Sequence, residues 1–202
     1  MEIKYRDIML RDTVEADLSD ELRWYTEQTQ WAQWDAPWEM LEEIKNFDPT
    51  KTTNVFLDTL KKEKPEIRTT LELDTADGVH IGTVSSYLID EKYNSIPRKN
   101  VQNGQKVYTT LGIDICESRF WNRGLGAQAL TAWILYFLKN GIQDICLQTW
   151  SGNLRMVHCA QKLGFLECDR KKGIRTVGSK IYDGLTFCLD ETRFRQFLLL
   201  ET

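Results

Sequence analysis

The first half of the chain alternates between two hydrophobic periods, one typical of strands and one typical of helices. Short apolar runs that end at polar residues predict strands, whereas apolar residues spaced three and four apart predict amphipathic helices. The strands expected here are residues 8–11, 68–73 and 79–89, and the helices are a segment from about 14 and the segments 39–47 and 54–62. Asp12 and Thr13 are candidate caps of the first helix, and Asp77-Gly78 is the expected hairpin turn.

The second half continues the alternation, interrupted first by a polar segment, residues 91–105, that predicts a loop. The strands expected here are residues 107–115, 144–150, 167–177 and 180–189, and the helices are 127–138, a segment ending at 163, and 192–200. Gly164 lies where a left-handed residue ends a helix. The order β-α-α-β-β-β-α-β-α-β-β predicts an α/β chain whose N-terminal half is largely antiparallel.

A glycine loop separates the strand 107–115 from the helix 127–138. Its sequence is Trp121-Asn122-Arg123-Gly124-Leu125-Gly126-Ala127. Glycines at a helix start let the backbone approach an anion, which the free N–H groups and the helix dipole then favour. The spacing does not match a nucleoside-triphosphate loop, and Ala129 replaces the third glycine of a dinucleotide loop. Taken alone, such a segment is more often a helix start that contains glycines by chance.

Two sequence blocks carry a resemblance to a known family. The loop resembles [Q/R]-x-x-G-x-[G/A], the pyrophosphate loop of the GNAT superfamily of acyl-CoA N-acyltransferases, with Trp121 in place of Gln or Arg. In this respect the loop resembles the subgroup that contains the ribosomal-protein N-terminal acetyltransferases and the spermidine acetyltransferases, where an aromatic or polar residue often occupies this position. The second block, from Asn153-x-Arg155 to Gly164-Phe165, resembles the family's N-x-R-S-x-x-x-Y-E-K-x-G-F segment. Together the blocks cover residues 107–165 in the expected order.

The resemblance implies one GNAT domain over residues 1–202, with class α/β (α+β). Its sheet is mixed, mostly antiparallel, twisted, splayed at the cofactor site and flanked by helices. The length of 202 residues fits one such domain. The implied reaction moves an acetyl group from acetyl-CoA to a primary amine by direct attack. The cofactor-binding residues that the resemblance implies are Ile113, Asp114, Ile115, Asn122, Arg123, Gly124, Leu125, Gly126, Ala127 and Asn153.

Roles within this set differ. The resemblance assigns the backbone of 113–115 to the pantetheine arm and acetyl carbonyl, and that of 122–127 to the pyrophosphate. Arg123 adds charge to a phosphate or is a solvated loop arginine. Asn153 is also a good helix N-cap, and both roles can hold together.

Asp114 is the candidate catalytic base, because it is an acid inside an apolar run, where a charge is costly unless it is used or paired. A carboxylate that points to solvent or bonds a backbone donor is the alternative. Ala160 stands where many family members carry a tyrosine that protonates the departing thiolate. Water or another side chain must supply that proton, and for His158 and Cys159 a packing or surface role is favoured. A non-catalytic acyl-CoA-binding or sensing module is therefore the alternative function, and a tryptophan-based interaction module is a third.

The acceptor site is expected at a tryptophan-rich connector. Aromatic rings beside carboxylates suit a cationic amine, on a small molecule or a protein N-terminus. The candidate acceptor residues are Trp31, Trp34, Asp35, Trp38, Glu39 and Tyr87. Tryptophans at this spacing are also typical of core packing.

The composition of the chain argues against several classes of binding partner. The formal net charge of −4 and the lack of a large basic cluster argue against nucleic acid. Five cysteines, an odd number without a C-x-x-C pair, predict free thiols, and two histidines far apart give a metal site little support. No apolar run approaches a membrane span and the first residues do not resemble a signal peptide, so a soluble cytoplasmic protein without a membrane partner is expected. The sequence does not decide whether the protein forms a homodimer.

Overall fold

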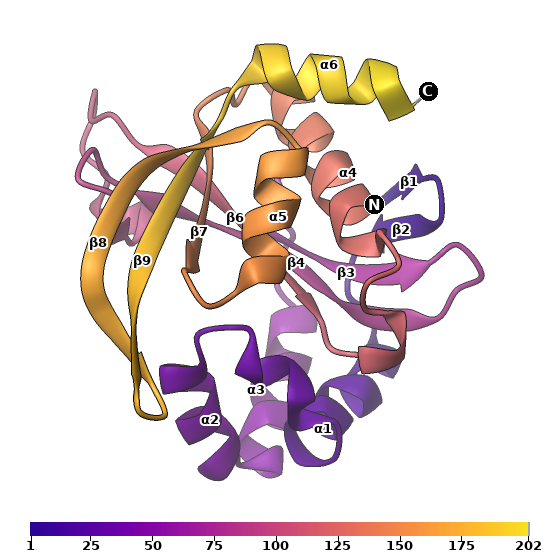
Figure 1. The fold of residues 1–202 in the computed structure, drawn as a ribbon. Helices are drawn as coiled ribbons and strands as arrows, with labels where there is room; N and C mark the ends of the chain where they lie inside the picture. The colour runs from indigo at the N-terminus through magenta and orange to yellow at the C-terminus, as the bar shows by residue number, and fades with distance from the viewer. Residues whose placement is uncertain (202) are drawn as a thin grey trace. The chain divides into compact units, whose positions relative to one another are not determined.

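The computed structural model describes residues 1–201 and shows a mixed sheet with six α-helices (Figure 1). The strands are β1 Glu2–Tyr5, β2 Ile8–Arg11, β3 Thr70–Thr75, β4 His80–Ile89, β5 Ser95–Ile96, β6 Tyr108–Ile115, β7 Ile145–Trp150, β8 Phe165–Val177 and β9 Lys180–Leu189. The helices are α1 Leu18–Thr26, α2 Pro37–Lys45, α3 Pro49–Leu60, α4 Leu125–Lys139, α5 Leu154–Lys162 and α6 Glu191–Glu201. Short 3-10 turns precede α1 at Glu15–Asp17 and α2 at Thr29–Gln33, and two more occupy Arg98–Asn100 and Ser118–Phe120.

The strands pair in the order β1-β2-β3-β4-β6-β7-β9-β8, with β5 beside β4. β6 and β7 pair in parallel, whereas β1–β2, β2–β3, β4–β5, β7–β9 and β8–β9 are antiparallel. The expected class, a mostly antiparallel mixed sheet flanked by helices, is therefore confirmed. Two short strands were not predicted: β1, which pairs with β2 across a turn with Arg6 at φ 50°, and β5, which lies inside the predicted loop 91–105.

The predicted caps of the first helix were wrong. Asp12 instead accepts a hydrogen bond from Arg68 Nε at 2.8 Å, and the Thr13 hydroxyl donates to Glu72 at 2.5 Å. Both side chains are held by charged partners on or next to β3, which are stronger than a free helix N–H. Asp17 takes the local role, since its carboxylate accepts the Val14 N–H at 2.8 Å.

α3 begins earlier than predicted, at Pro49 rather than near 54. The Asp48 carboxylate accepts the N–H groups of Thr50 and Lys51 and so caps the first turn. Proline at the first helical position loses no hydrogen bond, because that N–H has no partner within a helix. Asp48-Pro49 therefore starts a helix as well as ending the segment before it.

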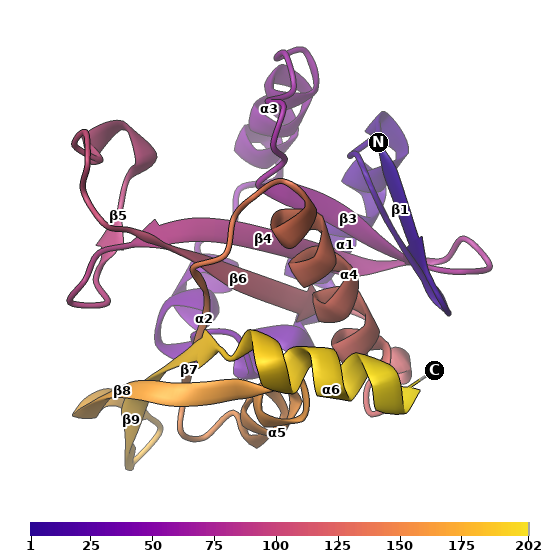
Figure 2. The same ribbon diagram turned by 90° about the horizontal axis from the view of Figure 1, so that it is seen from above.

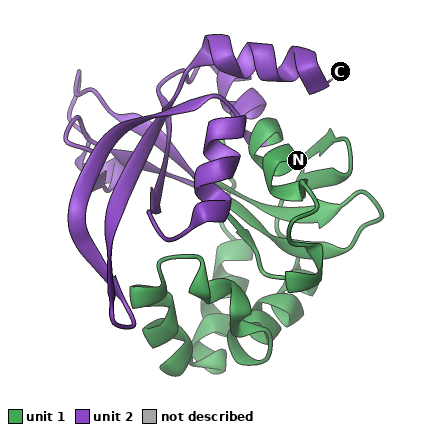
Figure 3. Ribbon diagram, in the orientation of Figure 1, with its two compact units in different colours: residues 1–84, 113–132 green, residues 85–112, 133–202 purple. Residues whose placement is uncertain are grey.

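The chain divides into two compact units, coloured in Figure 3. Unit 1 comprises residues 1–84 and 113–132, and unit 2 comprises residues 85–112 and 133–202. β4, β6 and α4 each contribute residues to both units. The interpretation of residues 1–202 as one domain stays a prediction.

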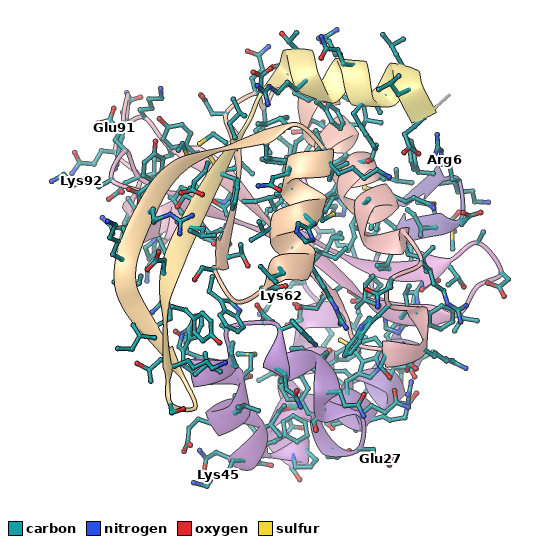
Figure 4. The ribbon with its side chains drawn as sticks, viewed as in Figure 1. Arg6, Glu27, Lys45, Lys62, Glu91 and Lys92 are labelled. Carbon is teal, nitrogen blue, oxygen red and sulfur yellow. The ribbon has the colours of Figure 1, made fainter. Side chains whose placement is uncertain are left out.

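Unit 1 has two apolar regions. The first lies on its strands, where Ile8, Leu10, Leu71, Leu73 and Ile81 are almost fully buried. The second joins its helices and consists of Trp24, Trp31, Ala32 and Cys116, packed by the partly buried Tyr25, Met40, Ile44 and Trp121. Charged side chains at the ends of these helices, such as Glu27 after α1 and Lys45 in α2, point outward (Figure 4).

Gly82 brings β4 into direct contact with the end of β6. A Cβ at this position would lie 1.8 Å from the Asp114 carbonyl oxygen, so only glycine fits. One residue away, the Cys116 N–H donates to the Ile81 carbonyl at 2.8 Å. These contacts fix the backbone around Asp114 within unit 1.

Unit 2 is built around β7, β8, β9 and α5, with β8 and β9 forming a long hairpin (Figure 1). The loop that carries β5 stands out from the end of β4 (Figure 2). Residues 133–139 of α4 bury Trp133 and Phe137 completely. Within residues 1–201, no helix has the length and apolar character needed to cross a membrane.

Candidate active site and cofactor loop

Among the described residues, the backbone N–H groups of 125–127 at the start of α4 have no hydrogen-bond acceptor. Asn122 and Gly124 have positive φ values of 59° and 79°, which turn the chain into the helix. The first hydrogen bond of α4 runs from the Gln128 N–H to the Gly124 carbonyl at 3.1 Å, so the N–H groups of 125–127 precede it. Alternating backbone conformations and unpaired helix N–H groups are typical of phosphate sites.

Gly126 lies close to the side chains at the end of β6. A Cβ at this position would meet Ile115 Cδ1 at 3.7 Å and Ile113 Cδ1 at 4.0 Å, which is ordinary contact. Because side chains alternate along a strand, Ile113 and Ile115 face the loop, while Asp114 between them faces the opposite side. The loop and the candidate base therefore lie on opposite faces of the same short piece of strand.

Trp121 ties the loop to that strand. Its indole Nε1 donates a hydrogen bond to the Ile115 carbonyl at 2.6 Å, and its ring packs on the apolar cluster of unit 1. The side chain that departs from the family pattern thus has a structural task here. Arg123 is exposed, with its guanidinium 5.4 Å from the centre of the Phe120 ring.

Asp114 and Asp35 are two carboxyls of unit 1 whose charges repel each other. Burial, and then the nearby Asp35 carboxylate, raise the pKa of Asp114 well above its usual value. Burial also raises the pKa of Asp35, to which the charges of Glu39 and Glu43 add. Like charges that share a poorly solvated site hold protons to higher pH, which suits groups that exchange protons with an amine.

Asp35, Glu39, Glu43 and Asp114 form what we call the acidic group. Among the described residues, no lysine or arginine forms a salt bridge with Asp35, Glu43 or Asp114. Glu39 and Glu43 are exposed on α2, whereas Asp35 and Asp114 are half-buried. The negative charge of this group is therefore not neutralised within the unit.

The Tyr25 phenol borders the acidic group. Burial, followed by the charges of Glu43 and Glu21, raises its pKa. Tyr25 therefore stays a neutral hydroxyl at physiological pH. Its ring stacks on Phe47 at 4.9 Å and contacts Trp31 edge to face at 5.3 Å.

The three candidate tryptophans have different surroundings. Trp31 is 6% exposed and donates its indole N–H to the Trp24 carbonyl at 2.9 Å, so its ring is part of the core of unit 1. Trp34 and Trp38 are half-buried. Trp38 donates its indole N–H to Glu39 at 3.0 Å, which places an aromatic ring beside the acidic group.

Two candidate residues belong to unit 2. The Tyr87 hydroxyl donates to Gln148 at 2.9 Å, and the Asn153 carboxamide caps α5 by accepting the Met156 N–H at 3.1 Å. Ala160 is fully buried in α5. The N-cap role weighed for Asn153 is thus present, while its contact with the cofactor stays a prediction.

A family comparison decides the class of the protein. The model of the acetyltransferase (GNAT) domain family matches residues 7–166, which span both sequence blocks and both units. The chain belongs to the GNAT acetyltransferase family. It is thereby an acyltransferase, and the resemblance seen in the glycine loop and the Asn153–Phe165 block is confirmed.

Solved structures support the same fold for this GNAT acetyltransferase. A GNAT-family acetyltransferase from Bacillus anthracis is similar with a TM-score of 0.66 and 13% identity, over 95% of this chain and 99% of that one. RimL, a ribosomal L7/L12 α-N-protein acetyltransferase solved with coenzyme A, is similar with a TM-score of 0.66 and 13% identity, over 93% of this chain and 97% of that one. A chimera of spermidine N-acetyltransferase SpeG from Vibrio cholerae and hSSAT has a TM-score of 0.63 and 14% identity, over 94% of this chain and 99% of that one. A search of curated proteins finds no match.

The GNAT acetyltransferase also contains a buried charge cluster that sequence reasoning missed. His80 lies between carboxylates, with Nδ1 3.0 Å from Asp20 and 3.5 Å from Asp17, and Nε2 3.1 Å from Glu72. Burial disfavours the charge of His80, but these carboxylates outweigh it and raise the pKa of the imidazole. Within residues 1–201, no group of three or more His, Cys, Asp or Glu side chains has a metal-binding arrangement.

Replacing His80 with glutamine is expected to remove a pH-dependent part of the stability. A raised folded-state pKa means that charged His80 stabilises fully below its unfolded pKa of about 6.5 and that this contribution is lost as pH rises through the folded value. We expect the His80→Gln variant to lose about 2 kcal/mol of unfolding free energy at pH 6 and less at pH 9, measured by urea denaturation. His158→Gln, at an exposed site, is the control. An equal loss at both pH values would contradict the charged state of His80.

Proposed function

We propose that this GNAT acetyltransferase moves an acetyl group from acetyl-CoA to a primary amine on a cationic acceptor, a small molecule or a protein N-terminus. The observation that carries the proposal is the arrangement in unit 1 around one residue. Gly126 of the loop lies beside Ile113 and Ile115, within reach of a single added methyl group, and between these isoleucines Asp114 belongs to the acidic group. A phosphate-binding loop and a set of amine-binding carboxylates are thus separated by the thickness of one strand.

The residues present fit acetyl-CoA. The free N–H groups of 125–127 suit its pyrophosphate, the positive φ values of Asn122 and Gly124 turn the chain into the helix, and Gly124 and Gly126 place no side chain in the way of the anion. The register between β6 and β7 runs from Thr109 to Leu111, so Ile113–Ile115 follow the paired part of β6. Backbone groups beyond a ladder are suited to a pantetheine arm, which binds as an added strand does. When bound, acetyl-CoA supplies an acetyl group activated as a thioester.

The acidic group supplies the binding and deprotonation of the amine. Glu39 and Glu43 attract the cation at the surface, and Asp35 and Asp114 receive it in a poorly solvated position. Asp114 takes one proton from the ammonium group, which leaves a neutral amine able to attack. The raised pKa of Asp114 makes this transfer easier than it would be for an exposed aspartate.

The proton for the leaving thiolate comes from water in this proposal. Ala160, at the position where many relatives carry an acidic tyrosine, has no proton to donate. The solution pKa of a thiol is about 8.5, so its thiolate is a stable leaving group near neutral pH and needs little assistance.

Thiol release from acetyl-CoA over a panel of polyamines, aminoglycosides, amino acids and short peptides tests this function. We expect turnover with cationic amines and a thermal shift with coenzyme A, since a ligand at about 100 times its Kd adds ~2.7 kcal/mol. A thermal shift without turnover on any amine would instead support the non-catalytic acyl-CoA-binding module. Absence of both would overturn the proposal.

The double change Asp35→Asn with Glu39→Gln is expected to raise the KM of a cationic acceptor about tenfold, the equivalent of ~1.4 kcal/mol. Two carboxylates that attract the ammonium group are lost, while the glycine loop is untouched, so the KM of acetyl-CoA stays within about twofold. Glu42→Gln, an exposed acid of the same helix, is the matched control. An unchanged acceptor KM would place the acceptor elsewhere.

A further inference from the structure

Three of the five cysteines form a sulfur cluster in unit 2. Cys188 Sγ lies 2.8 Å from Cys146 Sγ and 2.7 Å from Cys168 Sγ. Cys188 is therefore shared between two neighbours. Among the described residues, neither Cys116 nor Cys159 has a sulfur partner.

The strand register produces the first of these contacts. Cys146 of β7 and Cys188 of β9 lie directly opposite each other in an antiparallel pair. Opposite residues in such a pair have Cα atoms about 4.5–5.5 Å apart, inside the range of about 4.4–6.8 Å that a disulfide spans. The backbone thus already has the separation that a disulfide requires.

A β-bulge produces the second contact. The β8–β9 register pairs Leu166 with Cys188 and Glu167 with Phe187, and then resumes at Asp169 with Thr186. Cys168 is the extra residue, without a partner in the ladder, and the local bend of a bulge redirects its side chain. Its sulfur contacts Cys188 and the Thr186 carbonyl.

Solvent access falls across the cluster, because Cys168 is exposed, Cys188 half-buried and Cys146 buried. We propose that the sulfur cluster is a site of thiol–disulfide exchange with low-molecular-weight disulfides, in which Cys168 is the entry thiol and Cys188 the resolving thiol. This inference is independent of the acetyl-transfer reaction.

The exchange balances without a further oxidant. The Cys168 thiolate attacks a small disulfide R–S–S–R, breaks its S–S bond, forms a mixed disulfide and releases one R–S⁻, which takes up the proton lost by Cys168. The Cys188 thiolate then attacks Cys168 Sγ, forms the Cys168–Cys188 bond and releases the second R–S⁻, which takes up its proton. Cys146 can next attack Cys188 Sγ, which moves the bond to Cys146–Cys188 and regenerates the Cys168 thiol.

The attack of Cys168 on a small disulfide is expected to be slow at neutral pH and to accelerate as pH rises. Burial first, and then the Cys188 hydrogen bond and the charges of Cys188 and Asp169, raise the pKa of Cys168 to about 12, although a hydrogen bond from Tyr93 opposes this. The reactive thiolate fraction therefore grows about tenfold per pH unit up to pH 10. A solvated thiol with a pKa near 8.5 would instead level off above about pH 9.

The test is incubation of the whole protein with oxidised glutathione, followed by thiol counting under denaturing conditions and peptide mapping. We expect the wild type to fall from five free thiols to three when the bond is Cys168–Cys188, and to two when it is Cys146–Cys188 and the regenerated Cys168 thiol forms a mixed disulfide with glutathione. Cys159→Ser, which removes a cysteine outside the cluster, is the matched control and is expected to lose the same number of thiols as the wild type from a starting count of four. Dithiothreitol is expected to restore all thiols.

Two variants separate the assigned roles. Cys188→Ser is expected to form no intramolecular disulfide and to stop at a Cys168 mixed disulfide with glutathione. Cys168→Ser is expected to form the Cys146–Cys188 bond at least about tenfold more slowly, because the exposed entry thiol is lost. Five remaining thiols in the wild type, a disulfide that includes Cys116 or Cys159, or an unchanged rate in Cys168→Ser would overturn the proposal. A melting curve for each variant establishes that it is folded.

Discussion

Asp114→Asn is expected to lower kcat by at least about a hundredfold, the scale of a lost general base, and at the same time to raise the melting temperature at pH 8. The loss of turnover follows because an amide cannot accept a proton from the ammonium group. The gain in stability follows because the amide carries no charge into the poorly solvated acidic group. Opposite signs for activity and stability distinguish a functional carboxyl from a structural one.

The sign of the stability effect depends on pH. The folded-state pKa of Asp114 lies above its unfolded value, so protonated Asp114 favours the folded state at low pH. That contribution is lost as pH rises through the folded value. The wild type is therefore expected to lose stability relative to Asp114→Asn between about pH 4, the unfolded pKa of an aspartate, and pH 8.

Calorimetric melting at pH 4 and pH 8, with thiol-release kinetics at saturating substrates, measures both effects. Asp58→Asn on α3 is the control, since Asp58 is exposed and forms a surface salt bridge with Lys61, the residue that follows the helix. A variant that keeps the wild-type kcat would remove Asp114 from the mechanism. A lower melting temperature at pH 8 would show that the Asp114 carboxylate is stabilised by a partner.

The glycine loop could be predicted from sequence because its signal is local. Gly124 and Gly126 lie between an apolar strand and an amphipathic helix, and the positive φ of Gly124 is a property of that residue and its neighbours. Asp114 could be singled out for the same reason, as one acid in an apolar run. Features that depend on a few consecutive residues were thus accessible without a structure.

The partners of Asp114 could not be predicted in full, because they come from distant segments. Asp35 and Glu39 were candidates from the sequence, and Glu43 lies one helical turn after Glu39 on α2, but the approach of Asp35 to Asp114 depends on packing between distant segments. The Tyr25 phenol borders the same group from α1. No period or motif in the sequence records which helix faces end up together.

The two clusters missed entirely show the same limit. His80 meets Glu72 because β3 and β4 are neighbours, and Asp20 because α1 packs on them. Cys168 meets Cys188 through a bulge, and a one-residue register change is invisible to a pattern of alternating residues. An odd cysteine count correctly indicated free thiols and said nothing of their proximity.

Gly126→Glu is expected to weaken coenzyme A binding by at least about a hundredfold, or ~2.7 kcal/mol, while the protein stays folded. A glutamate side chain at this position introduces both bulk and negative charge beside the free N–H groups of 125–127. Isothermal titration calorimetry with coenzyme A measures the loss. The fold is expected to tolerate the change, since Gly126 does not have a positive φ and a Cβ there meets only the two isoleucine side chains.

Gly126→Ala is the matched control, because it adds the same Cβ without the charge. Its methyl group would lie 3.7 Å from Ile115 Cδ1, so we expect the Kd of coenzyme A to stay within about threefold of the wild type. Tight binding by a folded Gly126→Glu variant would separate the glycine loop from the pyrophosphate. Equal losses in both variants would instead mean that the space at Gly126, and not the charge near the N–H groups, controls binding. Only a large difference between glutamate and alanine assigns the start of α4 to an anion.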